Sequence, residues 1–297
     1  MWVRLIPFVF VVLWASGFVG ARFGLQYAEP ATLLSLRMIA NVALFLLLIV
    51  LLRRHLPRGK ALLHSGVVGL FIHGFYLGGT YFAIHLGMPA GLSSLLVGLQ
   101  PILTAFLLVV FTQHSFKPSQ WLGLVIGFAG ISLVLMGKMD WQSEQHKTLA
   151  VAVCLVSLIG ITLGTLYQKR FCQGVDMVGG ATVQYFAAGL LFVPVALTFE
   201  TNVIVWSPAF IMTLVWLVVV LSCVAILLLL YMVENGVASS VASVFYLVPP
   251  VTAIQAWLMF GESFDAMGVM GFVLAALAVF LVTKAPTVPR IRKWARV

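Results

Sequence analysis

Charged side chains are scarce in this sequence: they make up 8% of its 297 residues, against about 25% in ordinary soluble domains. Hydrophobic residues make up 62%. A soluble chain of this size could not keep so much apolar surface away from water, so lipid must be its solvent. The composition therefore excludes a soluble domain and predicts an all-α polytopic membrane protein.

Cysteine is also rare, and the three cysteines show no metal-ligand spacing. Cys154, Cys172 and Cys223 lie in or beside apolar segments and are odd in number, which favours free structural thiols. The sequence lacks a phosphate-binding loop and a credibly placed Ser-His-Asp set, and its histidines are scattered. We therefore expect no enzyme activity, no metal and no cofactor.

Ten apolar segments are long enough to cross a membrane as helices, which takes about 20 residues each. Their expected bounds are 5–22, 31–52, 62–84, 90–111, 118–137, 148–168, 178–199, 209–232, 238–258 and 264–283. The first segment could imitate a signal peptide, but no polar domain follows it, so a first transmembrane helix is the better interpretation.

The basic residues predict the orientation of these helices. With a cytoplasmic N-terminus, thirteen Lys and Arg residues fall on the cytoplasmic side and three outside, while Arg37 lies within the second span. The positive-inside rule therefore places both termini in the cytoplasm, and we expect a multi-pass protein of a bacterial-type inner membrane. Because the basic clusters flank apolar segments, we expect contact with the lipid bilayer and none with nucleic acid.

The two halves of the chain resemble each other at a shift of 148 residues. This shift places Arg22 on Arg170, Pro101 on Pro249, Thr104 on Thr252 and Gly123 on Gly271. It predicts two five-helix repeats, 1–147 and 148–284, followed by a cytoplasmic tail, 285–297. Because five is odd, the repeats must be inverted, which is a transporter architecture with its substrate site where the halves meet.

Four segments carry a resemblance to a known family. They are LWASGFVGARFG (13–24), SLRMIANVAL (35–44), GLSSLLVGLQPILTAFLLVVF (91–111) and GESFDAMGVMGFVLAALAVFLV (261–282). With them the chain resembles the drug/metabolite transporter superfamily, EamA type. The resemblance implies ten spans in two inverted repeats and a central cavity that carries small organic solutes, often exporting amino acids or related metabolites. It also places the fifth and tenth helices outside that cavity.

One position departs from the family pattern. The family commonly carries an acid just after the fourth and ninth spans; Glu262 fills the second place, but His114 stands at the first. The sequence therefore provides one acid at these two places instead of a pair.

Prolines interrupt the fourth and ninth helices at matching places. Pro101, and Pro249 with Pro250, each remove a backbone donor and clash with the preceding turn. They have a gating or structural role: either kinks that line the pathway and flex, or static packing kinks. We expect the two interrupted segments to face each other across the cavity.

Polar and aromatic side chains inside the spans are candidates for binding substrate. The candidates are Trp14, Ser16, Tyr76, Tyr81, Gln100, Thr165, Tyr231, Tyr246 and Gln255. An amide at this depth is costly without a partner and so faces the interior, where its partner could be a ligand or another helix. Tyr76, Thr80, Tyr81 and His85 form a stripe on the third helix, although an interfacial belt is an alternative for its outer end.

Three ionisable residues have less certain roles. Arg37 lies about two turns into the second helix, where burying its charge without a partner would cost a few kcal/mol. Its partner could be backbone carbonyls, Glu29 or a substrate carboxylate. We favour a structural or gating role for Arg37. Glu234 is a gating candidate or a boundary carboxylate. His73 is a candidate proton carrier, against the alternative of a satisfied buried histidine.

These features predict a secondary transporter that exports amino acids or related small metabolites by alternating access. The alternatives are a multidrug or lipophilic-compound exporter and, from another class, a non-transporting membrane receptor or enzyme. Its partners would be a small-molecule metabolite and the bilayer, and the protein would be a monomer or homodimer.

Overall fold

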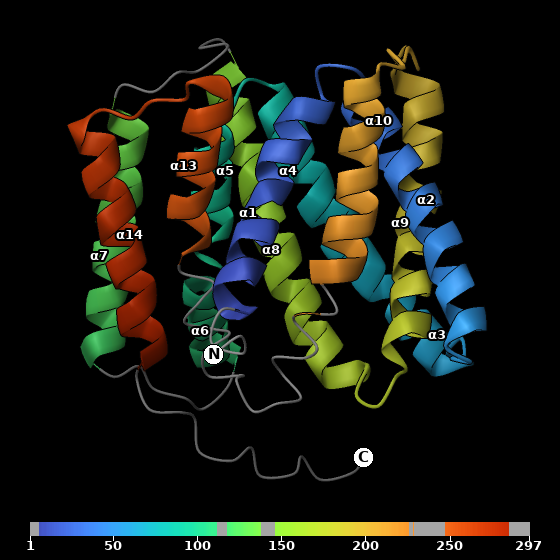
Figure 1. Cartoon of the computed structure of the whole chain (residues 1–297). Coiled ribbons are helices and arrows are strands. Elements are labelled where there is room, and N and C mark those ends of the chain that lie inside the picture. Colours follow the sequence, from blue (N-terminus) through green and yellow to red (C-terminus); the bar gives the residue numbers. More distant parts are fainter. Residues whose placement is uncertain (1–5, 112–117, 138–145, 226–227, 229–246, 285–297) are drawn as a thin grey trace, which may run out of the picture.

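The computed structural model is a bundle of helices that run roughly along one common direction (Figure 1). It describes residues 6–111, 118–137, 146–225, 228 and 247–284. Eight helical segments are long and apolar enough to cross a membrane, and two shorter apolar helices, Val248–Phe260 and Ala266–Leu281, accompany them. The predicted all-helical membrane architecture of ten spans is confirmed.

The helices of the first half follow one another with short connections. They are α1 (Ile6–Gly24), α2 (Pro30–Leu51), α3 (Lys60–Gly69), the π-helix η2 (Leu70–Leu77), α4 (Gly78–His85), α5 (Ala90–Val97), α6 (Gln100–Phe111) and α7 (Pro118–Met136). In this half α3, η2 and α4 form one continuous span, and α5 with α6 forms another.

The described helices of the second half follow the same plan. They are α8 (Lys147–Phe171), α9 (Met177–Phe199), α10 (Pro208–Val215), the π-helix η4 (Trp216–Ala225), α13 (Val248–Phe260) and α14 (Ala266–Lys284). Here α10 and η4 form one span.

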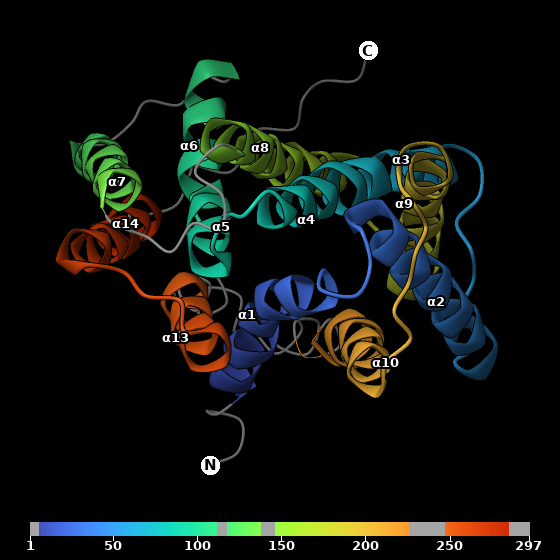
Figure 2. The same ribbon diagram turned by 90° about the horizontal axis from the view of Figure 1, so that it is seen from above.

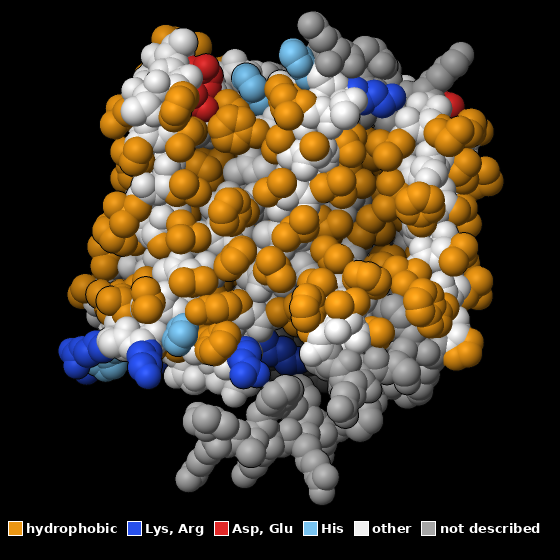
Figure 3. Space-filling view, turned by 180° about the vertical axis from the view of Figure 1, so that it is seen from behind, with side chains coloured by type: hydrophobic (Ala, Val, Ile, Leu, Met, Phe, Trp, Pro, Cys, Tyr) orange, Lys and Arg blue, Asp and Glu red, His pale blue; other side chains and the backbone are white. Residues whose placement is uncertain are grey.

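The surface of the bundle is suited to lipid. Hydrophobic side chains cover the face seen in Figure 3 between its two ends, where the charged groups gather. Most of the basic side chains on this face lie at the lower end, and the acidic ones lie at the upper end together with a basic group. The lower end is where α2 and α8 finish, close to Arg53, Arg54, Lys169 and Arg170.

Seen from above, α7 and α14 pack against each other at one side of the bundle (Figure 2). Glycines allow this close approach, because a Cβ atom on Gly130 would lie 2.8 Å from the carbonyl oxygen of Gly271. The pair stands apart from α2, α3 and α9 at the opposite side, while α1, α4, α5 and α8 lie between. The fifth and tenth spans thus lie at the periphery, as the resemblance implied.

The fourth span is interrupted where the sequence predicted it. Helix α5 ends at Val97 and α6 begins at Gln100, which places Pro101 in the first turn of a new helix. Proline is tolerated there, because the N–H it lacks would have no helical partner. Pro249 and Pro250 likewise lie in the first turn of α13.

The expectation that the two interrupted segments face each other across a cavity is wrong for this conformation. A Cβ atom on Gly98 would lie 2.9 Å from Cγ of Pro249, and one on Gly91 would lie 3.3 Å from Cα of Ala253. The segments are therefore in direct contact, because glycine leaves no side chain to hold them apart.

Two π-helical stretches, which the sequence did not predict, occur at corresponding places in the halves. The shift of 148 residues carries Leu70–Leu77 onto residues 218–225, which lie within Trp216–Ala225. Such wide turns occur frequently at functional sites.

Candidate functional site

The side chain of Arg37 is buried between helices of the bundle. It is 7% exposed and its Nη1 donates a hydrogen bond to the hydroxyl of Tyr81, at 2.8 Å. Two residues singled out from the sequence, on α2 and α4, are therefore brought together. Glu29, one of the partners considered for Arg37, instead accepts hydrogen bonds from Thr201.

His73 lies beside this pair, within the π-helix η2. Its ring centroid is 4.4 Å from that of Tyr185 on α9, and the Tyr185 ring also packs edge-on against Phe45 of α2, at 5.2 Å. The side chain of Gln184 lies next to the histidine ring. His73 thus lies where α2, η2 and α9 meet, and its role as a proton carrier stays a prediction.

Several buried polar atoms around Arg37 have no hydrogen-bond partner among the described residues. They are Nε of Arg37, both amide atoms of Asn41, Nδ1 of His73 and Oγ1 of Thr80. We call Arg37, Asn41, His73, Thr80 and Tyr81 the Arg37 cluster. Orphaned polar atoms are rare in protein interiors, and each of these atoms needs a partner, such as a water molecule or a ligand.

The other two members of the predicted stripe, Tyr76 and His85, differ in their surroundings. Tyr76 lies close enough to Arg37 and Tyr81 to interact with both electrostatically. Tyr76 is buried and belongs to the same core cluster as Phe10, Phe18 and Cys154. His85 is exposed in the last turn of α4. The stripe is thus divided between a buried middle and an exposed end.

Gln100 and Thr165, both predicted to bind substrate, bind each other. The side-chain amide of Gln100 donates to the hydroxyl of Thr165 at 2.9 Å, and that hydroxyl in turn donates to the carbonyl of Ile161 at 2.8 Å. This contact joins the first half to the second beside the break in the fourth span.

Trp14 and Ser16 lie on α1 with different surroundings. Trp14 is half-buried, and its ring centroid lies 5.4 Å from that of Phe10. The hydroxyl of Ser16 accepts a hydrogen bond from the indole of Trp216 at 2.8 Å, a second contact between the halves. Trp216 was not singled out from the sequence, although a tryptophan inside a long apolar run is an available signal.

Gln255 on α13 makes a third contact between the halves. Its Nε2 donates to the carbonyl of Val12 at 3.0 Å, while its Oε1 is buried without a partner among the described residues.

A small, partly open apolar pocket, with room for little more than a water molecule, lies next to the helix breaks. It is lined by Leu95, Gly98, Leu99, Pro249, Pro250, Phe272, Ala275, Ala276 and Val279. Because these residues offer no polar side chain, the pocket cannot pair with the charged groups of a metabolite.

A buried carboxylate lies between the end of α13 and the start of α5, which are both at the upper end of the bundle in Figure 1. Glu262, which follows α13, forms an ion pair with Arg22 and accepts hydrogen bonds from the backbone N–H groups of Ala90 and Gly91 at 2.9 and 3.2 Å. It thereby caps the N-terminus of α5, which lacks a side-chain cap of its own. The Arg22 guanidinium also lies 4.5 Å from the centre of the Phe260 ring.

A second acid makes a similar bridge at the same end. Glu200, which follows α9, accepts hydrogen bonds from the backbone N–H groups of Ala31 and Thr32, both at 2.7 Å, and so caps α2. In return, Glu29 accepts hydrogen bonds from the hydroxyl and the backbone N–H of Thr201. The hydrogen bond from the hydroxyl lowers the pKa of the Glu29 carboxyl. Both caps therefore join the first half to the second.

Three predicted residues, Tyr231, Glu234 and Tyr246, lie outside the described residues. Among the described residues, no group of three His, Cys, Asp or Glu side chains could hold a metal ion. Asn41 was missed, although a polar residue within an apolar span, four places after Arg37, is itself a signal.

A ten-span helical bundle whose two halves meet through hydrogen-bonded polar side chains has the architecture of a polytopic membrane transporter. The model of the EamA-like transporter family matches residues 1–136 and 148–284. The chain therefore belongs to this family, and the resemblance noted in the sequence is confirmed.

Curated relatives from several organisms cover most of the chain. The Escherichia coli K12 protein "Uncharacterized inner membrane transporter YedA" is 25% identical over 277 residues, which is 93% of this chain and 89% of that protein. The "Probable terminal-alkyne amino-acid exporter" of Streptantibioticus cattleyicolor is 27% identical over 283 residues, 92% of this chain and 91% of that one. A crystal structure of another protein shares the fold, with a TM-score of 0.65 and 18% identity over 93% of this chain and 94% of that one.

Proposed function

We propose that this transporter exports amino acids or related small metabolites from the cytoplasm by alternating access between its two halves. The observation that carries the proposal is the pair of acid caps at one end. Glu262 and Glu200 both belong to the second half, and they hold the N-termini of α5 and α2 in the first half. Polar bridges of this kind can break and re-form as the halves move, because water can form hydrogen bonds with the separated groups.

The direction and substrate class have separate support. The basic residues at the opposite end favour that end as cytoplasmic, so the capped end would face outward and be closed in this conformation. The relative from Streptantibioticus cattleyicolor is named as an amino-acid exporter, and the sequence covers almost its whole length.

Flux measurements test this proposal. Vesicles reconstituted with the protein and loaded with labelled amino acids should show protein-dependent efflux. Gln100→Ala should slow it between about threefold and about twentyfold, the equivalent of the 0.6 to 1.7 kcal/mol found for hydrogen bonds between membrane helices. Trp14→Ala should slow it as well, because the ring packs on α1 where the halves meet.

Matched substitutions away from these contacts serve as controls. Trp257→Ala removes an indole that is 59% exposed on α13, and Gln173→Ala removes an exposed amide at the end of α8. Both should leave efflux unchanged. If neither change alters efflux, the assignment of Gln100 and Trp14 to the substrate site is rejected. If the protein exports only lipophilic dyes, the result favours the multidrug alternative.

A further inference from the structure

We propose that the Arg37 cluster binds the carboxylate group of the transported metabolite. This inference rests on the proposed function, and it assigns to Arg37 a binding role in place of the structural or gating role that the sequence favoured.

The first argument is charge. Arg37 is buried and makes no ion pair among the described residues, where its hydrogen bond goes to a neutral phenol. Three acids of the described residues are engaged elsewhere: Glu29 with Thr201, Glu200 with α2, and Glu262 with Arg22. A buried cation without a counter-charge is costly, and a bound anion would remove that cost.

The second argument is the supply of donors. The Arg37 guanidinium has five N–H groups, and Nε is buried without a partner. The Tyr81 hydroxyl accepts from Arg37, so its own proton is directed elsewhere. Asn41 lies one helical turn after Arg37 on the same face of α2, and its amide is also without a partner among the described residues.

The third argument is location. Arg37 is seven residues into α2, or about 10 Å below the end of the helix. Helices α2 and α9 lie side by side (Figure 2), and Tyr185 of α9 corresponds to Arg37 under the shift of 148 residues. The cluster therefore lies at the contact between halves, next to a π-helical stretch, where inverted-repeat transporters place their substrate.

The composition of the cluster selects a singly charged anion. Arg37 is its one side chain of fixed charge, and a guanidinium fork matches the two oxygens of a carboxylate. A phosphate dianion would leave an excess negative charge buried among neutral groups. A carboxylate would leave none.

Ligand binding to the purified full-length protein tests this directly, with the shift in melting temperature as the readout. The probes are the twenty standard L-amino acids, each paired with its C-terminal amide, which lacks the carboxylate. A second set holds butyrate, hexanoate and phenylacetate, which lack the ammonium group. We expect the acid of each binding pair to stabilise the protein at concentrations at which its amide does not.

Variants connect this discrimination to the cluster. Arg37→Gln should weaken binding of the acids by at least about tenfold, the loss of one charge-assisted hydrogen bond, and Arg37→Lys should restore part of it. Asn41→Asp keeps Arg37 but places a carboxylate of the protein next to it, which would compete with the ligand's carboxylate. This variant should therefore weaken binding of the acids to a similar extent, and it can be tested even if Arg37→Gln does not fold. Arg54→Gln, at an exposed arginine paired with Asp176, is the matched control and should change nothing.

Each result decides the matter. Equal binding of acids and amides, or acid binding that survives both Arg37→Gln and Asn41→Asp, would overturn the proposal. If chloride or phosphate competes for the Arg37 cluster as strongly as carboxylates do, the cluster is a site for inorganic anions instead. If only the acids without an ammonium group bind, and their binding depends on Arg37, the carboxylate site is supported but the proposal of amino-acid export is rejected. If no carboxylate binds, the cluster is not a carboxylate site.

Discussion

Replacing Glu262 by glutamine should open the capped end of the molecule to the outside. The carboxylate is 2% exposed, pairs with Arg22, and accepts hydrogen bonds from two backbone N–H groups at the start of α5. Glutamine keeps one oxygen to accept a hydrogen bond but loses the charge. The cap on α5 would be weakened and the ion pair with Arg22 lost.

The size of the effect follows from this burial. Removing one partner of a buried ion pair costs about 3 to 5 kcal/mol, and the lower figure applies because the Arg22 side chain is 13% exposed. If the closed conformation bears the whole cost, about 3 kcal/mol shifts its equilibrium with the outward-open conformation by roughly 100-fold. A smaller share gives a proportionately smaller shift.

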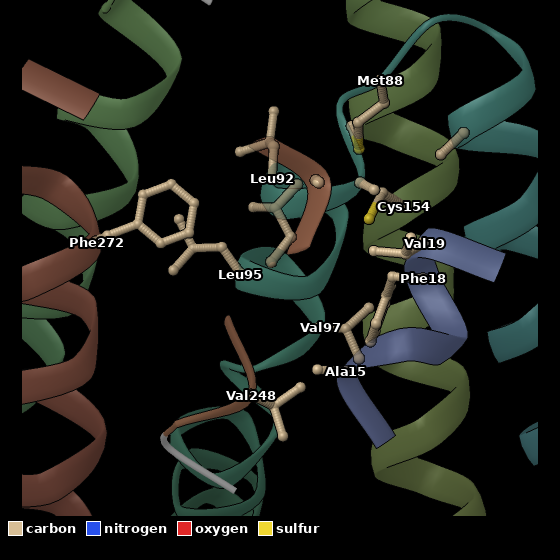
Figure 4. Close-up of a cluster of buried hydrophobic side chains, with 14 of the residues drawn as sticks. Ala15, Phe18, Val19, Met88, Leu92, Leu95, Val97, Cys154, Val248 and Phe272 are labelled. Atoms are coloured by element: carbon tan, nitrogen blue, oxygen red, sulfur yellow. The ribbon is translucent and has the colours of Figure 1, made fainter. Parts of the chain in front are cut away.

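The native thiol of Cys154 can report this opening. It is completely buried in the core cluster beneath the capped turn, among Phe18, Val19 and Met88 (Figure 4). Its Sγ lies 3.7 Å from the hydroxyl of Ser93, three residues after Ala90, to which Glu262 binds. Separation of α5 from α8 at this end would expose the thiol.

The assay measures labelling of Cys154 by a membrane-impermeant maleimide added to intact cells, with Cys172 and Cys223 replaced by serine. Glu262→Gln should raise the labelling rate by up to roughly 100-fold. Asp176→Asn removes a capping acid at the other end of the bundle and is the matched control, which should label at the unaltered rate.

An unchanged labelling rate in a Glu262→Gln protein that has lost thermal stability would refute this reasoning. The ion pair would then stabilise both conformations equally. Labelling only from the cytoplasmic side would reject the predicted orientation.

Two further predictions concern stability. The pKa of the Glu29 carboxyl is lowered from its ordinary value of 4.5, chiefly by the hydrogen bond from the Thr201 hydroxyl. The stability that this hydrogen bond contributes is therefore complete above pH 4.5 and is lost as the pH falls through the lowered pKa. The melting temperatures of wild type and Thr201→Val should thus differ at neutral pH and converge in acid; a constant difference would contradict the linkage. Gly69→Ala places a Cβ atom 2.3 Å from the backbone oxygen of Gln184, so it should destabilise the fold by about 1 to 3 kcal/mol. Gly66→Ala, whose nearest contact is 3.9 Å, should be neutral, and equal melting temperatures of the two variants would reject the predicted clash.

The sequence predicted the fold closely because lipid imposes a simple rule. Each crossing needs about 20 apolar residues. Outside the eighth and ninth spans, parts of which lie beyond the described residues, the observed helices agree with the expected ranges within a few residues, as with Pro118–Met136 for 118–137. The break before Pro101 was predictable because proline removes a backbone donor and clashes with the preceding turn, although α9 continues through Pro194. The π-helices were not predictable, because no residue type requires a wide turn.

The site was only partly predictable. Arg37, Tyr81, Gln100 and Thr165 were each recognised as polar residues at a costly depth, but their pairing was not. Pairing depends on how helices rotate about their axes and which neighbours they meet. The contact of Ser16 with Trp216 joins residues 200 places apart and leaves no local pattern to read.

Composition and hydropathy thus determined the membrane class and the ten spans, and the resemblance of four segments indicated the family, because each depends on residue types along the chain. Only the tertiary structure decided that the interrupted segments touch, that acids of one half cap helices of the other, and that Arg37 is buried with no acid beside it among the described residues. These features depend on distances between side chains from separate helices. Packing of the helices, rather than the order of the residues, determines those distances.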